Sequence, residues 1–152
     1  MKNRRVIFTG TSFDTVEDLA LTVVNDYKLN QLFVASAEDF QTQCDSWLIG
    51  AISNFIECEN DLTYDLNTRT FNAELTQLEI KILADLWVIQ WFDRQTQDAT
   101  QINLKLSTSG GFVTHSESQN LKEKSSYIDK LREKVSQKIT EYQLLNPSVY
   151  SF

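Results

Sequence analysis

Glycine and proline are scarce in this chain of 152 residues, which contains four glycines and a single proline. The proline, Pro147, lies near the end of the sequence. Folds made of many strands joined by tight turns need glycine and proline at those turns. Their scarcity therefore predicts long helices. A chain of this length fits one domain, which buries roughly two-thirds of its unfolded surface.

Cysteine and histidine are equally rare, since Cys44, Cys58 and His115 are the only ones. Two cysteines without CxxC spacing and one histidine match no zinc-binding pattern, and they cannot form the disulfide framework of a small secreted domain. Cys44 falls on an apolar helical stripe, which predicts a buried side chain. Cys58 lies in a polar segment and could be a free thiol.

Catalytic motifs are also missing. A general base needs a positioned partner and a nucleophile, and His115 has only Ser116 beside it in sequence, so we expect a solvated loop histidine. Gly110-Gly111 belongs to no phosphate-binding motif. The acidic run at 57–65 lacks the ligand spacing and central glycine of a calcium loop. We therefore expect no enzymatic activity, no cofactor and no bound metal.

Long apolar runs and an even charge distribution are absent as well. No run is long enough to span a bilayer, and the apolar residues 6–8 are too few for a signal peptide, which predicts a soluble protein made in the cytoplasm. The net charge is −7. Between Phe13 and Thr68, eleven acidic residues stand against one basic residue, Lys28. Because DNA-binding proteins need basic stripes, this segment is expected to repel DNA.

Apolar residues at helical spacing are present, and they predict the first two helices. Each of these helices begins at a capping pattern, the first at residues 11–14 and the second at residues 36–39. The first apolar stripe runs from Val16 to Tyr27. The second runs from Phe40 to Ile56 and includes Trp47. Both helices are expected to bury one face.

A third helix is predicted from Thr76 to about Asp93 or Arg94, after a polar loop at 57–74 that contains a short extended piece at 70–72. The third helix is apolar nearly all round and includes Trp87 and Trp91. A helix without a polar face must be covered on most sides, so we expect it to be the central element.

The residues after the third helix form a predicted linker at 95–116. Within it, Ile102, Leu104 and Leu106 alternate with polar residues. Both a short helix and a strand fit this alternation, and periodicity does not decide between them.

The last helix is predicted from residues 116–119 to about Leu144. Such a helix spans about 40 Å, longer than a small bundle needs, and its apolar seam is narrow and flanked by charged residues. We therefore predict that the seam, together with the aromatic tail after Pro147, contacts neighbouring subunits. The predicted interface residues are Leu121, Ile128, Val135, Tyr142, Val149, Tyr150 and Phe152.

Together these elements predict an all-α fold, a helical bundle of about four helices with a long C-terminal helix and an extended C-terminal tail. The predicted organisation is an N-terminal arm at 1–12, a helical domain at 13–145 and a tail at 146–152.

The helical patterns resemble those of small head–tail connector (neck or adaptor) proteins of tailed bacteriophages. Phe13 to Leu29 resembles the first helix of that family, and Ser116 to Tyr142 resembles its long closing helix. The stretch from Phe71 to Trp91 is similar to the family's "FN…LT..E..IL..L.V..W" helix, which follows an acidic loop. The likeness covers about Phe13 to Leu145. The sequence departs from the family at 92–97, where relatives carry a more basic or proline-bearing stretch, in the Gly-Gly loop and in the tail.

The resemblance implies a virion protein at the head–tail junction. About a dozen copies would form a ring below the portal protein, bind the next connector or tail protein, and extend the channel through which genomic DNA passes without specific binding. The residues alone leave an alternative open. In that alternative the chain is a small helical protein-binding adaptor that self-associates through its C-terminal helix.

Overall fold

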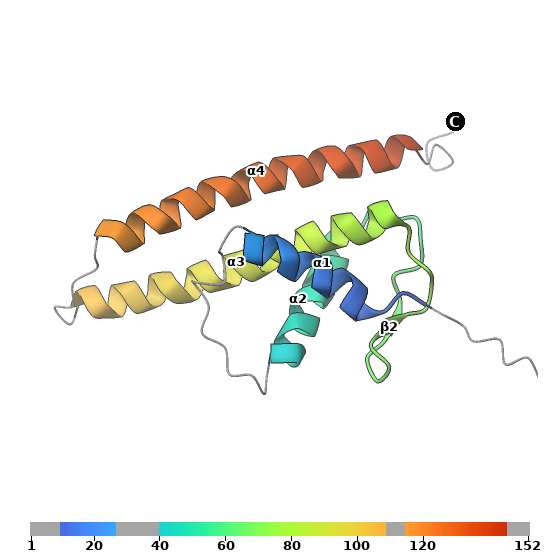
Figure 1. Ribbon diagram of the computed structural model, residues 1–152, viewed down its shortest axis with the longest axis horizontal. Helices are drawn as coiled ribbons and strands as arrows, with labels where there is room; N and C mark the ends of the chain where they lie inside the picture. Colours follow the sequence, from blue (N-terminus) through green and yellow to red (C-terminus); the bar gives the residue numbers. More distant parts are fainter. Residues whose placement is uncertain (1–9, 27–39, 109–114, 146–152) are drawn as a thin grey trace, which may run out of the picture.

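The structure, a computed structural model, describes residues 10–26, 40–108 and 115–145; the side chains of Asp26 and of residues 96–121 are outside the description. Within this part the chain forms four helices and one small hairpin (Figure 1). The helices are α1 (Phe13–Asp26), α2 (Phe40–Asn54), α3 (Gln77–Thr108) and α4 (His115–Leu145), and the strands are β1 (Tyr64–Asp65) and β2 (Thr70–Phe71). This confirms the predicted all-α class with its long C-terminal helix. The predicted tail lies outside the described residues.

The helix α1 begins where the capping pattern predicted. The Asp14 amide donates to Ser12 Oγ at 3.2 Å, which satisfies one of the amides that a helix start leaves without a partner. One face of the helix is fully buried and consists of Phe13, Val16, Ala20 and Val24. The apolar stripe therefore predicted the buried face of α1 correctly.

The helix α2 begins at Phe40 and ends at Asn54. Its predicted capping residues at 36–39 lie outside the described residues. Cys44 is buried, as its position on the stripe predicted, and its carbonyl oxygen accepts a hydrogen bond from Trp87 Nε1 at 3.0 Å. Ile56, at the far end of the predicted stripe, lies beyond the helix and is exposed.

The helix α3 is the centre of the core, as its apolar character predicted. Its buried side chains run from Ile80 to Phe92, and both Trp87 and Trp91 are among them. Trp87 also meets the ring of Trp47 edge-on, with ring centroids 5.5 Å apart. The tryptophans therefore belong to the core, with Trp47 half-buried at its margin.

The predicted end of the third helix near Asp93 or Arg94 is wrong, because α3 continues to Thr108 and spans 32 residues. The predicted linker at 95–116 is therefore mostly helix, and the alternating residues at 102–106 lie within it. Residues 95–108 contain neither glycine nor proline, so nothing in the local sequence breaks the helix. The loss of apolar periodicity therefore did not mark the end of this helix.

The helix α4 begins at His115, close to the predicted start, and ends at Leu145. It lies antiparallel to α3 along its length (Figure 1). Its fully buried side chains are Ile128, Leu131, Val135 and Tyr142. The predicted narrow seam is therefore present, and it faces the rest of the same chain.

The polar segment before α3 contains the hairpin, in which Tyr64 pairs with Phe71 and Asp65 with Thr70 in antiparallel register. The extended piece predicted at 70–72 is thus confirmed as β2, whereas its partner β1 was not predicted. The other edge of β2 is covered by residues 11–13. The Phe71 amide donates to the Thr11 carbonyl oxygen at 2.8 Å, and the Phe13 amide donates to the Arg69 carbonyl oxygen at 2.9 Å.

These bonds move the boundary of the predicted N-terminal arm, because residues 10–12 belong to the folded body. Gly10 passes so close to β2 that a Cβ atom built on it would lie 1.8 Å from the Phe71 carbonyl oxygen. Only a residue without a side chain fits at this crossing.

The close approach of Gly10 generates a prediction about stability. We expect Gly10→Ala to lower the free energy of unfolding by about 1–3 kcal/mol or more, because the backbone of β2 must move to admit the methyl group. Gly50→Ala is the matched control, since its Cβ would meet the flexible side chain of Gln90 at 3.0–3.1 Å and alanine favours the helix by up to about 1 kcal/mol. Urea unfolding of both variants measures the difference. Equal stabilities would contradict the close packing at Gly10.

Candidate functional site

The predicted interface residues fall into two groups in the structure. Ile128, Val135 and Tyr142 are between 1% and 4% exposed, because the seam of α4 is buried within its own chain. The expectation that these three contact neighbouring subunits is therefore corrected. The side chains of the other four, Leu121, Val149, Tyr150 and Phe152, lie outside the described residues.

Tyr142 joins the C-terminal end of α4 to the rest of the fold. Its hydroxyl donates to Glu79 Oε2 at 2.8 Å and accepts from the Glu59 amide at 2.9 Å. Its ring meets the ring of Phe55 edge-on, with centroids 5.3 Å apart. One side chain thus ties α4 to the start of α3 and to the loop that follows α2.

Glu79 is the centre of this contact. Its own amide donates to Thr76 Oγ1, and its Oε1 accepts from the Thr76 amide, which forms the predicted capping box. Asn60 Nδ2 donates to the same oxygen at 3.0 Å. Burial acts to raise the pKa of Glu79, but the hydrogen bonds from Thr76, Asn60 and Tyr142 outweigh it and lower the pKa below its usual range. The carboxylate is therefore held ionised inside the fold.

Cys58 also contacts this carboxylate, with its thiol 3.4 Å from Glu79 Oε2. The structure contains it as a free, half-buried cysteine. Burial raises the pKa of the thiol to about 11. Because the reactive species is the thiolate, Cys58 is a poor nucleophile at neutral pH and acts as a hydrogen-bond donor here.

A second polar contact joins α3 to α4 directly. Asp85 is fully buried, and its two oxygens each accept a hydrogen bond of 2.9 Å, one from Lys81 and one from Lys138. Arg132 of α4 also pairs with Asp93 of α3. A buried carboxylate needs such partners, since leaving one charge unpaired inside a protein is strongly destabilising. These pairs therefore set the register between the two long helices.

A third contact, the Arg69 cluster, holds the hairpin against α1 and α2. Nε and Nη2 of Arg69 donate to the two oxygens of Asp45 at 2.9 and 2.8 Å. The same guanidinium donates to Asp14 at 2.8 Å and to Glu17 at 2.7 Å. The sequence showed these acids only as an acidic segment and a helix start, because their shared partner is far away in the chain.

Apart from Glu17 Oε1, which receives no hydrogen bond, the polar groups of these three contacts form bonds within the chain. In the described ranges, no group of three or more histidine, cysteine, aspartate or glutamate side chains is arranged to hold a metal ion. His115 is the first residue of α4 rather than a loop residue, and its side chain lies outside the description. The described polar side chains therefore join the helices and the hairpin to one another.

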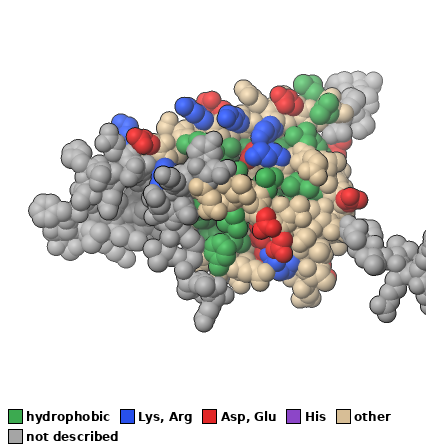
Figure 2. Space-filling view, in the orientation of Figure 1, with side chains coloured by type: hydrophobic (Ala, Val, Ile, Leu, Met, Phe, Trp, Pro, Cys, Tyr) green, Lys and Arg blue, Asp and Glu red, His purple; other side chains and the backbone are tan. Residues whose placement is uncertain are grey.

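Among the described residues, the surface carries an apolar feature that the sequence analysis missed. Leu144 and Leu145, at the end of α4, are 75% and 71% exposed, and we call them the leucine edge. Hydrophobic side chains gather at the corresponding end of the molecule in Figure 2. Adjacent residues point about 100° apart on a helix, so Leu144 and Leu145 cannot both lie on the narrow seam, and Leu145 lies beyond Tyr142, the last buried residue of α4. The two adjacent leucines were the feature of the sequence that could have predicted this exposed apolar surface.

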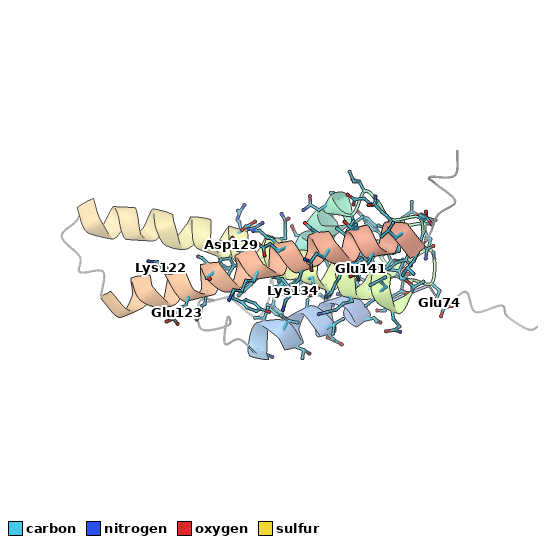
Figure 3. The ribbon with its side chains drawn as sticks, turned by 90° about the horizontal axis from the view of Figure 1, so that it is seen from above. Glu74, Lys122, Glu123, Asp129, Lys134 and Glu141 are labelled. Atoms are coloured by element: carbon cyan, nitrogen blue, oxygen red, sulfur yellow. The ribbon has the colours of Figure 1, made fainter. Side chains whose placement is uncertain are left out.

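The outer side of α4 carries charges of both signs. Lys122, Glu123, Asp129, Lys134 and Glu141 lie along it (Figure 3). Acidic and basic side chains are likewise intermixed on the face drawn in Figure 2. A nucleic-acid-binding surface needs a stripe of basic side chains, and this side of α4 does not provide one.

Comparisons with known proteins identify no relative of this chain. No protein family, curated protein or solved structure matches it. A separate search of the described helices finds none that is both long enough and apolar enough to cross a membrane.

The Tyr142 hydroxyl generates a prediction about stability. Tyr142→Phe leaves the ring in place but removes a donor to buried Glu79 and an acceptor for the Glu59 amide. We expect the free energy of unfolding to fall by about 1–3 kcal/mol. Tyr64→Phe is the matched control, because the structure records no hydrogen bond to that hydroxyl among the described residues, and its effect should stay within about 0.5 kcal/mol. If both variants unfold at the same denaturant concentration, the proposed tie between α4 and α3 is refuted.

Proposed function

We propose that this chain is a structural subunit of a ring at the head–tail junction of a tailed bacteriophage. In this role it binds the portal protein on one side and the next connector or tail protein on the other. The observation that supports it best is the shape of the α3–α4 hairpin, whose far half extends beyond α1 and α2 (Figure 1). The family resemblance of the helical patterns adds to this support.

The α3–α4 pair is longer than the part of the molecule formed by α1 and α2, which packs against one half of it. The fully buried side chains of α3 end at Phe92 and those of α4 begin at Ile128, within the side chains that the structure describes. Residues 95–108 add about 20 Å of helix beyond that point. Here α3 and α4 have each other as a neighbour, while α1 and α2 lie at the other half (Figure 1). A neighbouring subunit would pack beside this half of the α3–α4 pair, which extends past α1 and α2 (Figure 1).

The leucine edge offers a second surface at the opposite end of α4. Subunits in a closed ring contact one another through two different surfaces, one on each side of the subunit. The half of the α3–α4 pair that extends past α1 and α2 and the leucine edge are different surfaces at opposite ends of this pair of helices (Figure 1). Contiguous exposed apolar side chains mark surfaces that another protein covers, and Leu144 and Leu145 are adjacent.

The charge of the chain fits a channel wall. A net charge of −7 repels DNA phosphates, so genomic DNA passing through such a ring would not adhere to it. The location that follows is the virion neck. The alternative of an adaptor that dimerises through the seam of α4 has less support, because the seam positions Ile128, Val135 and Tyr142 are buried within the chain.

The proposal is tested by mixing the purified chain with the portal ring encoded in the same genome. We expect a complex with about a dozen copies of this chain, visible as a second ring by electron microscopy and countable by native mass spectrometry. The chain alone is measured in parallel, since a ring that forms without the portal also supports the proposal. A chain that neither forms a large homo-oligomer nor binds the portal contradicts it.

A surface variant sharpens this test. We expect the double variant Leu144→Ser, Leu145→Ser to lower the amount of ring at least tenfold at equal protein concentration, because it removes exposed apolar surface without entering the core. Leu66→Ser is the control, since Leu66 is 54% exposed but lies between β1 and β2, away from the end of α4. Circular dichroism checks that both variants are folded. Rings that form equally well from both variants would exclude the leucine edge as a subunit contact.

A further inference from the structure

The Arg69 cluster contains more negative than positive groups. One guanidinium serves three carboxylates, those of Asp14, Glu17 and Asp45. With all three ionised, the cluster would carry a net charge of −2 at the junction of α1, α2 and the hairpin. Only Asp14 is well exposed to water, because the side chains of Glu17 and Asp45 are 5% and 14% exposed. Water therefore screens little of the repulsion between them.

Glu17 is the group in the cluster that most disfavours ionisation. Its Oε2 accepts from Arg69, but its buried Oε1 receives no hydrogen bond from any donor group of the described residues. Burial, followed by a hydrogen bond with Asp45 and the charge of Asp45, raises the pKa of Glu17 to about 8. Asp45 behaves in the opposite way. Its partial burial acts to raise its pKa, but hydrogen bonds from Arg69 and Glu17 lower it below the usual range.

The groups that face Glu17 come from three elements. Asp14 lies on the same helix, Asp45 on α2 and Arg69 in the hairpin, and these three act on its pKa. Cys44 of α2 is also close enough to respond to Glu17, although burial is the main cause that raises the pKa of its thiol to about 12. α3 contributes no charge to this set.

Arg69 is held in a strained position by these contacts. Its φ of 53° lies in the left-handed region, which a residue other than glycine rarely adopts. Its carbonyl oxygen accepts from the Phe13 amide at the start of α1. The side chain and the backbone of one residue thus both fasten the hairpin to α1, and weakening the side-chain contacts favours relaxation of the backbone.

We propose that the Arg69 cluster is a proton-dependent latch. A proton on Glu17, shared with Asp45, holds the hairpin against residues 11–13, α1 and α2, and its loss loosens this junction while α3 and α4 stay folded. The inference concerns a conformational change within the chain and does not depend on the proposed role in a phage neck.

The direction of the pH dependence follows from the difference between the closed and open states. In the open state Glu17 is solvated and returns toward its ordinary pKa of 4.5. The closed state therefore binds a proton that the open state lacks throughout the range between 4.5 and about 8. Opening is least favoured below pH 4.5, rises by about tenfold per pH unit within that range and levels off above it. The lowered pKa of Asp45 acts only below its ordinary value of 3.8, and Cys44 acts only above 9.

Amide hydrogen exchange measures this opening at single residues. The reporters are the amides of Phe13 and Phe71, whose bonds cross the junction. After correction for intrinsic exchange rates, we expect their opening constant to rise about 70-fold between pH 5.5 and 7.5. The amide of Val88, in the buried part of α3, serves as the internal reference and should not follow this rise. A flat response at Phe13 and Phe71, or the same rise at Val88, overturns the latch.

Two variants separate the latch from other titrating groups. Glu17→Gln keeps the shape and the donor of the protonated acid, so its opening constant should be flat across the same range. Asp18→Asn changes an exposed acid one position further along α1 and should keep the wild-type slope. A direct carboxyl titration of Glu17 by NMR in the unmodified protein complements them. A midpoint near 8 supports the latch, and a midpoint within one unit of 4.5 overturns it.

Discussion

The first half of α3 carries apolar side chains on nearly all of its faces, and the rest of the described structure packs around it. Trp87, Val88 and Leu83 are fully buried there, and each side chain of this kind contributes about 1.5–3 kcal/mol when it leaves water. A helix without a polar face has no stable arrangement as a surface element, so α1, α2 and α4 must each cover part of it. This single constraint accounts for the arrangement of α1, α2 and α4 around α3.

Polar contacts then fix how the outer elements sit on that centre. Tyr142 and Lys138 position α4 through Glu79 and Asp85, and Arg69 positions the hairpin against α1 and α2. Each contact lies at the margin of the apolar core, where two or three elements meet. Hydrophobic burial is not directional, so it holds elements together without choosing their register. Hydrogen-bonded charges are directional, and their geometry supplies the register that burial alone leaves open.

The framework is compact on one side and extended on the other. The buried side chains described for α3 lie where α1 and α2 pack against it, and the pair of α3 and α4 continues past α1 and α2 (Figure 1). The leucine edge lies at the other end of the α3–α4 pair. This uneven distribution of cover is what makes assembly with other subunits a coherent proposal, whereas the polar clusters inside the body serve its own stability and, at Glu17, its response to protons.

Local sequence determined the helices themselves: the caps at Ser12 and Thr76, the buried face of α1 and the narrow seam of α4 all follow from short-range patterns. It did not determine where α3 ends, because the helix continues to Thr108, past its predicted apolar stretch. Nor could it show that the seam is covered by its own chain, or that Arg69 meets carboxylates 24 to 55 residues away. Those contacts depend on how the helices pack, and only the tertiary structure decided which distant side chains would share one small buried volume.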